Sequence, residues 1–447
     1  MPAEPGGTLT YNPHDIWITT LALVPSTIAQ HPNLIMGCAG STMASDADQL
    51  YLSQKLVSNA IDRTLIQKKK KELKEMRLFL LGAGESGKST VLKQMRLMHK
   101  HSFTDFERRQ YTEVIWFDLI ESMKVLIFNA RKLGIPLDCD QPNLSLVKFK
   151  RIIMQTKGIE DCQPGEMSLI GDYYVGYDLK RGLIDPEMTL LLSCEFNDKS
   201  EVCVEGQAKK FSRAEQAEAI SMLWTKDSGI KKCYQQSNNF QLELSVSYYF
   251  DNVHKFKNPM YRSSDQDIIM GRIKTTGITE STFEINNTTL KVLDAGGQRS
   301  ERKKWIHCFE NIDAIIFVLA VLEYDQMLYE DGRVHRMNES FQLFEAICNS
   351  TWFQNTPFIL FLNKVDLLEK KLPLSPIAQY FPDYKLDPLD VNSVLDYFES
   401  RLLGLNRTQK PIYIHRTCAT DTKSMSFVLT AVTDMIIQQS LKRSGII

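Results

Sequence analysis

The 447-residue sequence contains no apolar stretch of the length that a membrane-spanning helix needs. Its longest apolar run, Ala314 to Leu322, is far short of the roughly 18 residues that indicate a span. The nine cysteines include no C-x-x-C pair, and no H-E-x-x-H occurs. Neither a zinc site nor a disulfide framework is therefore predicted, and a reducing compartment is expected. The net charge of -1 gives no reason to expect nucleic acid as a partner.

The first 35 residues lack lysine and arginine and contain five prolines. A secretory signal needs a basic start, so residues 1–36 are predicted to be a disordered extension. Directly after it, Met36-Gly37-Cys38 fits an N-myristoylation pattern with a neighbouring cysteine for palmitoylation. Myristoylation needs a terminal glycine, so either translation starts at Met36 or the extension abolishes this anchor. The expected location is the cytoplasmic face of the plasma membrane if Gly37 or Cys38 is acylated, and otherwise the cytoplasm.

Residues 44–76 contain no proline or glycine, and apolar residues recur in them at near-helical spacing. This pattern predicts an amphipathic N-terminal helix within residues 37–76. It leads into the lysine run Lys68 to Lys71. The run is either a solvated face or a site of attraction to anionic lipid, at about 1 kcal/mol per lysine near the surface. A membrane surface is therefore one expected partner.

The main chemical signal is the stretch 78–90, LFLLGAGESGKST. A short apolar run predicts a buried strand, a helix-prone run begins at Val91, and the pattern G-x-x-x-x-G-K-S lies between them. Its glycines permit turns whose N–H groups point at phosphate oxygens. Lys88 is expected to reach the β and γ phosphates of a nucleotide, and the Ser89 hydroxyl to ligate Mg²⁺. The alternative is a glycine-rich turn with no ligand.

Apolar runs rich in Ile, Val and Phe recur after residue 280 and predict five further strands. They are 281–286 and 289–294, which form a hairpin, followed by 314–320, 357–362 and 411–416. Helical stretches separate the later runs, and a last helix is predicted at 422–442. The pattern predicts an α/β fold with a doubly wound, mostly parallel six-stranded sheet. The ligand site of such a sheet lies at the carboxyl ends of its strands.

Between residues 101 and 271 the alternation of strand and helix disappears. Apolar residues at helical spacing from Ile115 to Ala130, and again in 213–224, predict an inserted all-α domain. The α/β domain then comprises 77–100 and 272–447.

A polar motif begins at the end of each of two predicted strands: one starts at Asp294 and the other at Asn363. An aspartate at 294 can hold Mg²⁺ through water, Gly297 lets its N–H approach a γ phosphate, and Gln298 can orient attacking water. In isolation, this motif would be an ordinary turn.

Asn363-Lys364-Val-Asp366 distinguishes between nucleotides. A carboxylate accepts two hydrogen bonds from guanine, from N1–H and the 2-amino group, whereas adenine presents no such pair. Asp366 therefore favours GTP over ATP, and Lys364 is expected to lie along the purine. After the last strand, 417–420 is expected to offer a backbone N–H to the guanine carbonyl. Alternatively, Asn363-Lys364-Val-Asp366 is simply the N-terminus of a helix.

Arg272 and Thr275 lie just beyond the predicted insertion. A threonine here can complete an Mg²⁺ shell, and an arginine can neutralise charge on a transferring phosphoryl group. Without the other motifs, the segment would read as a basic linker.

In this order the motifs resemble the alpha subunits of heterotrimeric G proteins. The resemblance covers residues 37–447 and rests on GAGESGKST, RIKTTGI, DAGGQRSERKKWIHCFE, FLNKVDL and TCATDT. It implies a P-loop GTPase fold, with a Ras-like GTPase domain and an inserted helical domain. It also implies a switch that hydrolyses GTP to GDP with Mg²⁺ and relays a signal from a seven-helix receptor to an effector. The alternative function is a guanine-nucleotide-binding scaffold with little turnover.

The resemblance implies roles for individual residues as well. Arg272 and Gln298 would be catalytic, Ser89 and Thr275 would bind the metal with Asp294 acting through water, and Glu85 would pair with Arg272 in the GDP state. The implied nucleotide-binding residues are Gly82, Ala83, Gly84, Glu85, Ser86, Gly87, Lys88, Ser89, Thr90, Asp227, Ser228, Ile269, Met270, Gly271, Arg272, Thr275, Asp294, Gly296, Gly297, Gln298, Asn363, Lys364, Asp366, Cys418, Ala419 and Thr420.

The partners implied are a beta-gamma dimer, a receptor at the C-terminal helix and an effector at three switch segments. The switches lie near 271–280, 296–311 and 328–340. The dimer would dock on the N-terminal helix and on Lys304, Trp305, His307 and Cys308.

Two departures from the family pattern stand out. Met270 replaces a usual arginine, which removes a contact on the ribose side. The insertion is roughly fifty residues longer than in family members, and the extra material is expected within 138–208, where the sequence shows no clear period.

Overall fold

A computed structural model describes residues 51, 54–64, 75–99, 102–142, 145–156, 211–273, 275, 277–285, 288–328, 330–408 and 410–443. The chain divides into two compact units, Met1–Ile66 and Gln67–Ile447. In the first unit, residues 54–64 are helical and exposed. No helix in the described part of the chain is both long and apolar enough to cross a membrane. The predicted extension, Gly37, Cys38 and Lys68 to Lys71 lie outside the described residues.

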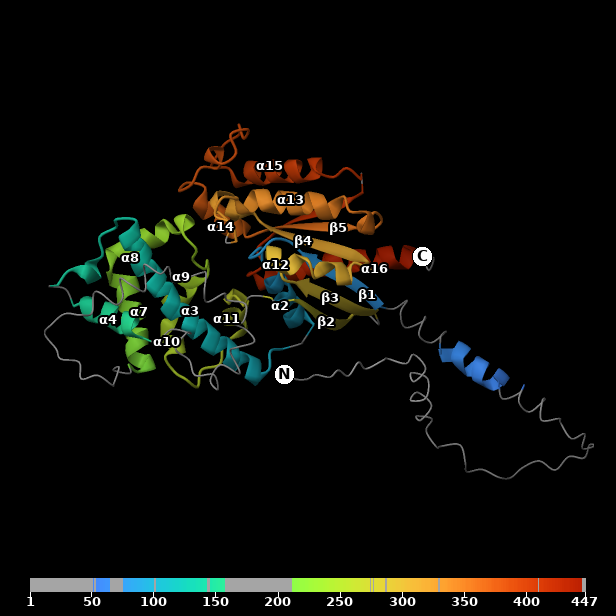
Figure 1. The fold of residues 1–447 in the computed structure, drawn as a ribbon, viewed down its shortest axis with the longest axis horizontal. Helices are drawn as coiled ribbons and strands as arrows, with labels where there is room; N and C mark the ends of the chain where they lie inside the picture. Colours follow the sequence, from blue (N-terminus) through green and yellow to red (C-terminus); the bar gives the residue numbers. More distant parts are fainter. Residues whose placement is uncertain are drawn as a thin grey trace, which may run out of the picture. The chain divides into compact units, whose positions relative to one another are not determined.

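The second unit is built on a six-stranded sheet in the order β2-β3-β1-β4-β5-β6 (Figure 1). Its strands are β1 (Glu75–Leu81), β2 (Ile278–Ile285), β3 (Thr288–Ala295), β4 (Ala314–Ala320), β5 (Phe358–Asn363) and β6 (Ile412–Thr417). Strands β2 and β3 pair antiparallel, and all other neighbours pair parallel. The predicted α/β fold with a mostly parallel six-stranded sheet is confirmed.

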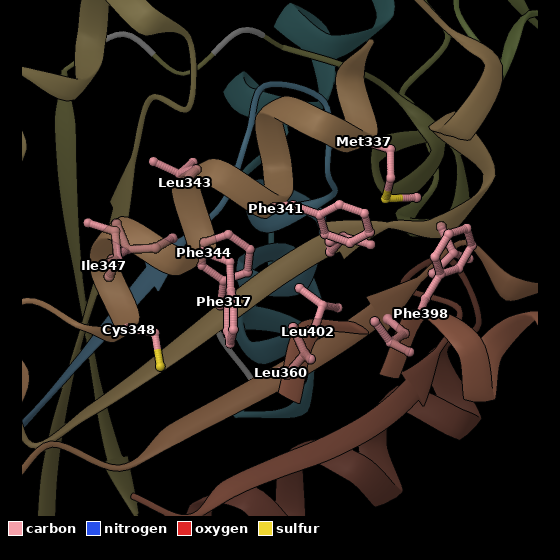
Figure 2. Packing of buried hydrophobic residues seen from close by; sticks show 14 of the residues in the cluster. Phe317, Met337, Phe341, Leu343, Phe344, Ile347, Cys348, Leu360, Phe398 and Leu402 are labelled. Atoms are coloured by element: carbon pink, nitrogen blue, oxygen red, sulfur yellow. The ribbon is translucent and has the colours of Figure 1, made fainter. Parts of the chain in front are cut away.

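Helices cover both faces of this sheet, which is why its central strands are apolar on both sides. Every residue of β4 and β5 is buried. On one face pack α13 (Arg336–Cys348) and α15 (Val391–Gly404), and on the other pack α2 (Lys88–Met98) and α16 (Thr422–Arg443). Figure 2 shows the first layer, where Phe344 of α13 meets Phe317 of β4 with their ring centroids 5.2 Å apart.

The helical insertion gathers beside the sheet (Figure 1). Its helices are α3 (Asp105–Lys132), α4 (Val147–Gln155), α7 (Arg213–Lys226), α8 (Ser228–Gln235), α9 (Val246–Asp251), α10 (Val253–Phe256) and α11 (Asp265–Met270). The long helix α3 begins with a capping box, in which Thr104 and Glu107 satisfy each other's free N–H groups. The apolar sides of these helices bury one core of their own, which makes the insertion a separate packing layer. Of the stretch 138–208, in which the sequence shows no clear period, the first part forms a short 3-10 helix (Asp138–Asp140) and α4, whereas residues 157–210 lie outside the described part.

The predicted end of the N-terminal helix, residue 76, is wrong, because residues 75 and 76 belong to a strand. Strand β1 begins at Glu75, since Glu75 and Met76 pair in register with Thr289 and Leu290 of β3. An ion pair of 2.9 Å between Glu75 and Lys291 of β3 supports this start. The other domain bounds stay predictions.

Two short helices follow strands of the sheet within a few residues: α12 (Arg299–Arg302) after β3 and α14 (Val365–Lys371) after β5. They lead the chain away from the carboxyl ends of these strands.

Candidate functional site

The loop between β1 and α2 needs glycine at two positions. Gly82 and Gly87 have φ of 142° and 105°, and a Cβ would lie 2.2 Å from the Val318 carbonyl oxygen and 2.2 Å from Asn363 Nδ2, respectively. Lys88, the first residue of α2, is buried, and its Nζ donates to the Ala83 carbonyl at 2.7 Å. Burial lowers the pKa of Lys88 to about 8, although Asp294 opposes the shift. The loop therefore folds around its own lysine.

Three side chains with oxygen ligands, Ser89, Thr275 and Asp294, lie close together at the start of α2. Ser89 Oγ lies 2.6 Å from both Asp294 Oδ2 and Thr275 Oγ1. The other carboxylate oxygen, Asp294 Oδ1, is buried without a hydrogen-bond partner among the described residues. Burial raises the pKa of Asp294, while Lys88 acts to lower it. Hydroxyl and carboxylate oxygens with an unsatisfied buried acceptor fit a hard cation such as Mg²⁺, which prefers oxygen ligands and keeps several waters.

The ends of β5 and β6 are tied to the phosphate loop by Asn363. Its Nδ2 donates to the Ser86 carbonyl at 2.8 Å, and its Oδ1 accepts from the Ala419 N–H at 2.9 Å. The Ala419 N–H, one of the backbone donors predicted for a base, is thus used inside the protein. Lys364 sits in the left-handed region with φ of 67° and pairs with Glu323 at 2.7 Å. Asp366 is exposed and lines the same cavity as Thr420.

Arg272 is held by two carboxylates. Its guanidinium lies 2.9 Å from Glu85 of the phosphate loop and 3.4 Å from Glu243 of the helical insertion. Glu85 is also 2.6 Å from Arg336 of α13. Burial acts to raise the pKa of Glu85, but Arg272 and Arg336 outweigh it and hold the value at about 2. The loop, the insertion and α13 therefore share one network of ion pairs.

A cavity of about 420 Å³ opens between these elements. The predicted site residues that line it are Gly84, Glu85, Gly87, Lys88, Ser89, Thr90, Ile269, Met270, Gly271, Arg272, Thr275, Gly297, Gln298, Asn363, Lys364, Asp366, Ala419 and Thr420. Others lie behind the wall and support it: these are Gly82, Ala83, Ser86, Asp294, Gly296 and Cys418. The volume suits a drug-sized or nucleotide-sized ligand.

The structure gives Asp227 and Ser228 a different position from the predicted one, away from the cavity lining. The Asp227 side chain is fully buried and caps α8 by accepting from the Gly229 and Ile230 N–H groups. It also accepts from the Cys139 N–H at 2.8 Å. An aspartate before a helix is a common cap, so its motif could not separate a cap from a ligand.

The insertion reaches the cavity through a segment that sequence reasoning missed. Glu243, Leu244, Ser245 and Ser247 line it, as does Lys93 of α2. The sequence offers one weak signal for the segment, a single acidic residue between two leucines. Because strand-end and loop motifs carried the prediction, a contact made by a helical insertion had no pattern to reveal it.

The predicted docking residues for a beta-gamma dimer are not all surface residues. Trp305 is 2% exposed, and its Nε1 donates to the Gly296 carbonyl at 2.9 Å. Lys304 pairs with Glu301 at 2.7 Å, His307 is exposed, and Cys308 is half-buried. In this structure Trp305 therefore supports the loop after β3 and offers a partner little area.

Replacing Gly297 with alanine is expected to destabilise the site. A Cβ at this position would lie 2.5 Å from Lys88 Nζ and 2.6 Å from the Ala83 carbonyl oxygen, so the loop or the turn after β3 must shift. Overpacking of this kind costs about 1–3 kcal/mol. Chemical unfolding of Gly297→Ala should show that loss. The matched control is Gly332→Ala, where nothing lies within 4 Å of a Cβ, and it should stay within about 0.5 kcal/mol of the native chain. Equal stabilities of the two variants would contradict the packing argument.

A glycine-rich loop between the first strand and its helix, with polar residues at the ends of parallel strands, defines a P-loop α/β protein with a helical insertion. The chain belongs to the G-protein alpha subunit family, whose model matches residues 55–436.

Relatives in yeasts match over most of the chain. A guanine nucleotide-binding protein subunit alpha of Candida albicans is 53% identical over 429 residues, which cover 92% of this chain and 100% of the relative. Guanine nucleotide-binding protein alpha-1 subunits of Saccharomyces cerevisiae and Kluyveromyces lactis are 46% and 47% identical, with the same coverage.

Proposed function

We propose that this chain is a GTP-binding molecular switch that hydrolyses GTP to GDP with Mg²⁺. One observation carries the proposal: a single cavity is lined by the glycine-rich loop, by Arg272 and Gln298, and by Asp366 at the end of β5. The residues proposed to bind the phosphates, to act in hydrolysis and to select the base therefore line the same cavity. The yeast relatives are named guanine nucleotide-binding proteins, which agrees with this choice of nucleotide.

The nucleotide is bound at its two ends. The N–H groups of the loop and the N-terminus of α2 face the phosphates, where the helix dipole favours negative charge. At the other end, the Asp366 carboxylate accepts from guanine N1–H and the 2-amino group. Asn363 fixes the distance between these ends, because it bonds both the phosphate loop and the loop after β6.

The reaction is attack of water on the γ phosphorus, with cleavage of the bond to the bridging oxygen. Ser89 and Thr275, with Asp294 acting through water, would hold Mg²⁺, which would neutralise phosphate charge. Gln298, whose Cγ lies 3.5 Å from the Cβ position of Gly84 and so beside the phosphate loop, orients the water. Arg272 leaves its carboxylate partners and neutralises the charge that develops on the phosphoryl group.

The switch acts as the alpha subunit of a heterotrimeric G protein. It relays a signal from a seven-helix receptor, bound at α16, to an effector bound at the three switch segments. A beta-gamma dimer docks on the N-terminal helix and on the surface that carries Lys304, His307 and Cys308. Acylation at Gly37 or Cys38 places the protein on the cytoplasmic face of the plasma membrane, and without it the protein is cytoplasmic.

Phosphate release from GTP by the purified full-length chain tests the proposal. Turnover should require Mg²⁺ and fall by at least about a hundredfold when EDTA removes it, because the ion contributes several kcal/mol of charge stabilisation. ATP at the same concentration should give no release. Tight GTP binding without phosphate release would favour the nucleotide-binding scaffold, and equal use of ATP and GTP would overturn the assignment.

A further inference from the structure

Glu243 is one of three acidic side chains, with Glu85 and Asp366, that line the cavity. It belongs to the segment before α9, lines the cavity, and its side chain is 12% exposed. Burial raises the pKa of Glu243, while Arg272 acts to lower it. A buried carboxylate is costly unless it is paired, so the ion pair with Arg272 stabilises Glu243 in its charged form, with a smaller contribution from Lys93.

The two carboxylates contact different nitrogens of the same guanidinium. Glu85 Oε1 lies 2.9 Å from Arg272 Nη2, and Glu243 Oε1 lies 3.4 Å from Arg272 Nη1. Glu85 has a second cationic partner in Arg336, which is 2.6 Å away. Glu85 therefore keeps an ion pair when Arg272 leaves it. Among the described residues Glu243 forms an ion pair with Arg272 alone and has Lys93 only as a more weakly acting cation, so the departure of Arg272 costs Glu243 more.

The backbone before Arg272 is fixed. Lys93 Nζ donates to the carbonyls of Ile268 and Gly271, at 2.9 and 2.7 Å, at the C-terminal end of α11. Movement of Arg272 toward a phosphoryl group is thus a movement of its side chain. That movement breaks the contact with Glu243, which is itself tied to the insertion.

We propose that Glu243 is a positioning residue that holds Arg272 away from the reacting phosphoryl group and thereby slows hydrolysis. This inference rests on the proposed GTPase function. Glu243 stabilises the ground-state position of Arg272, whereas the transition state needs Arg272 at the phosphate. An interaction that is stronger in the ground state than in the transition state raises the barrier.

Single-turnover GTP hydrolysis by full-length Glu243→Gln tests this role. Glutamine keeps the size and one hydrogen-bond acceptor but removes the charge. Hydrolysis should become roughly three- to tenfold faster, as expected for loss of one long charge-assisted hydrogen bond from the ground state. Glu243→Asp, which keeps the charge, should remain closer to the native rate. Damage to the fold would slow hydrolysis, so the sign of the change separates the two causes.

Two further variants make the test specific. The matched control is Glu113→Gln, which removes another carboxylate of the insertion, one that pairs with Arg213 at 2.9 Å and does not line the cavity. It should hydrolyse GTP at the native rate. In an Arg272→Cys background, Glu243→Gln should have no effect, because Glu243 acts through that arginine. An unchanged or slower rate in Glu243→Gln, or the same acceleration without Arg272, overturns the inference. If the native chain shows no GTP turnover, the proposed function fails with it.

Discussion

Single-turnover GTP hydrolysis is expected to fall by about a hundredfold or more in Gln298→Leu and in Arg272→Cys, while GTP binding persists. Both side chains line the cavity, and neither belongs to the loop that cradles the phosphates. Leucine cannot donate to or accept from the attacking water. Cysteine removes a positive charge that acts when phosphoryl charge develops, so the loss should appear in the rate rather than in GTP affinity.

Matched variants exist for both substitutions. Gln354→Leu changes an exposed glutamine, and Arg407→Cys changes an arginine whose side chain is 75% exposed and which pairs with Glu345. Neither residue lines the cavity. Their hydrolysis should match the native rate when bound nucleotide and released phosphate are measured in the same sample. A native rate in Gln298→Leu or in Arg272→Cys would remove that residue from the mechanism.

Asp366→Asn should weaken GTP binding by roughly a hundredfold, since about 3 kcal/mol from charged hydrogen bonds is lost. An asparagine offers one carbonyl oxygen, and its amide N–H₂ faces a guanine N–H that also donates. Xanthine carries a carbonyl where guanine has the 2-amino group, so XTP should bind this variant better than it binds the native chain. Competition against a fluorescent GTP analogue measures both affinities.

The control for this prediction is Asp396→Asn. Asp396 is an exposed carboxylate of α15 that pairs with Arg416, and it does not line the cavity. Its nucleotide preference should equal that of the native chain. Unaltered preference for GTP over XTP in Asp366→Asn would show that the base is selected elsewhere.

The parts of the fold that follow from short apolar runs are predictable from the sequence. The run at 314–320 coincides with β4, and the predicted strand and helix around the glycine-rich loop are present, although β1 and α2 each begin three residues before the predicted start, at Glu75 and Lys88. Central strands are buried on both faces, so their residues are apolar without interruption and easy to recognise. The end of the N-terminal helix is not, because pairing of Glu75 and Met76 with β3 overrides a helical pattern.

Side-chain roles were harder to predict wherever one residue type serves two purposes. Asp227 fits both a nucleotide contact and a helix cap, and the hydrogen bonds to Gly229 and Ile230 show the cap. Trp305 fits both an exposed docking residue and a buried support, and its bond to Gly296 shows the support. Burial distinguishes these roles, and burial depends on neighbours that are distant in the sequence.

By itself the sequence determined the sheet, the helical insertion, the glycine-rich loop and the residues at the strand ends, since each depends on a few adjacent residues. The resemblance already implied the ion pair between Arg272 and Glu85, which is present in the structure, but only the tertiary structure gave Arg272 a second carboxylate partner. Glu243 approaches it from the insertion, and Arg336, 251 residues away from Glu85 along the chain, shares that carboxylate. Such ion pairs form where folded elements bring charges together in a buried space, and no local pattern specifies that meeting.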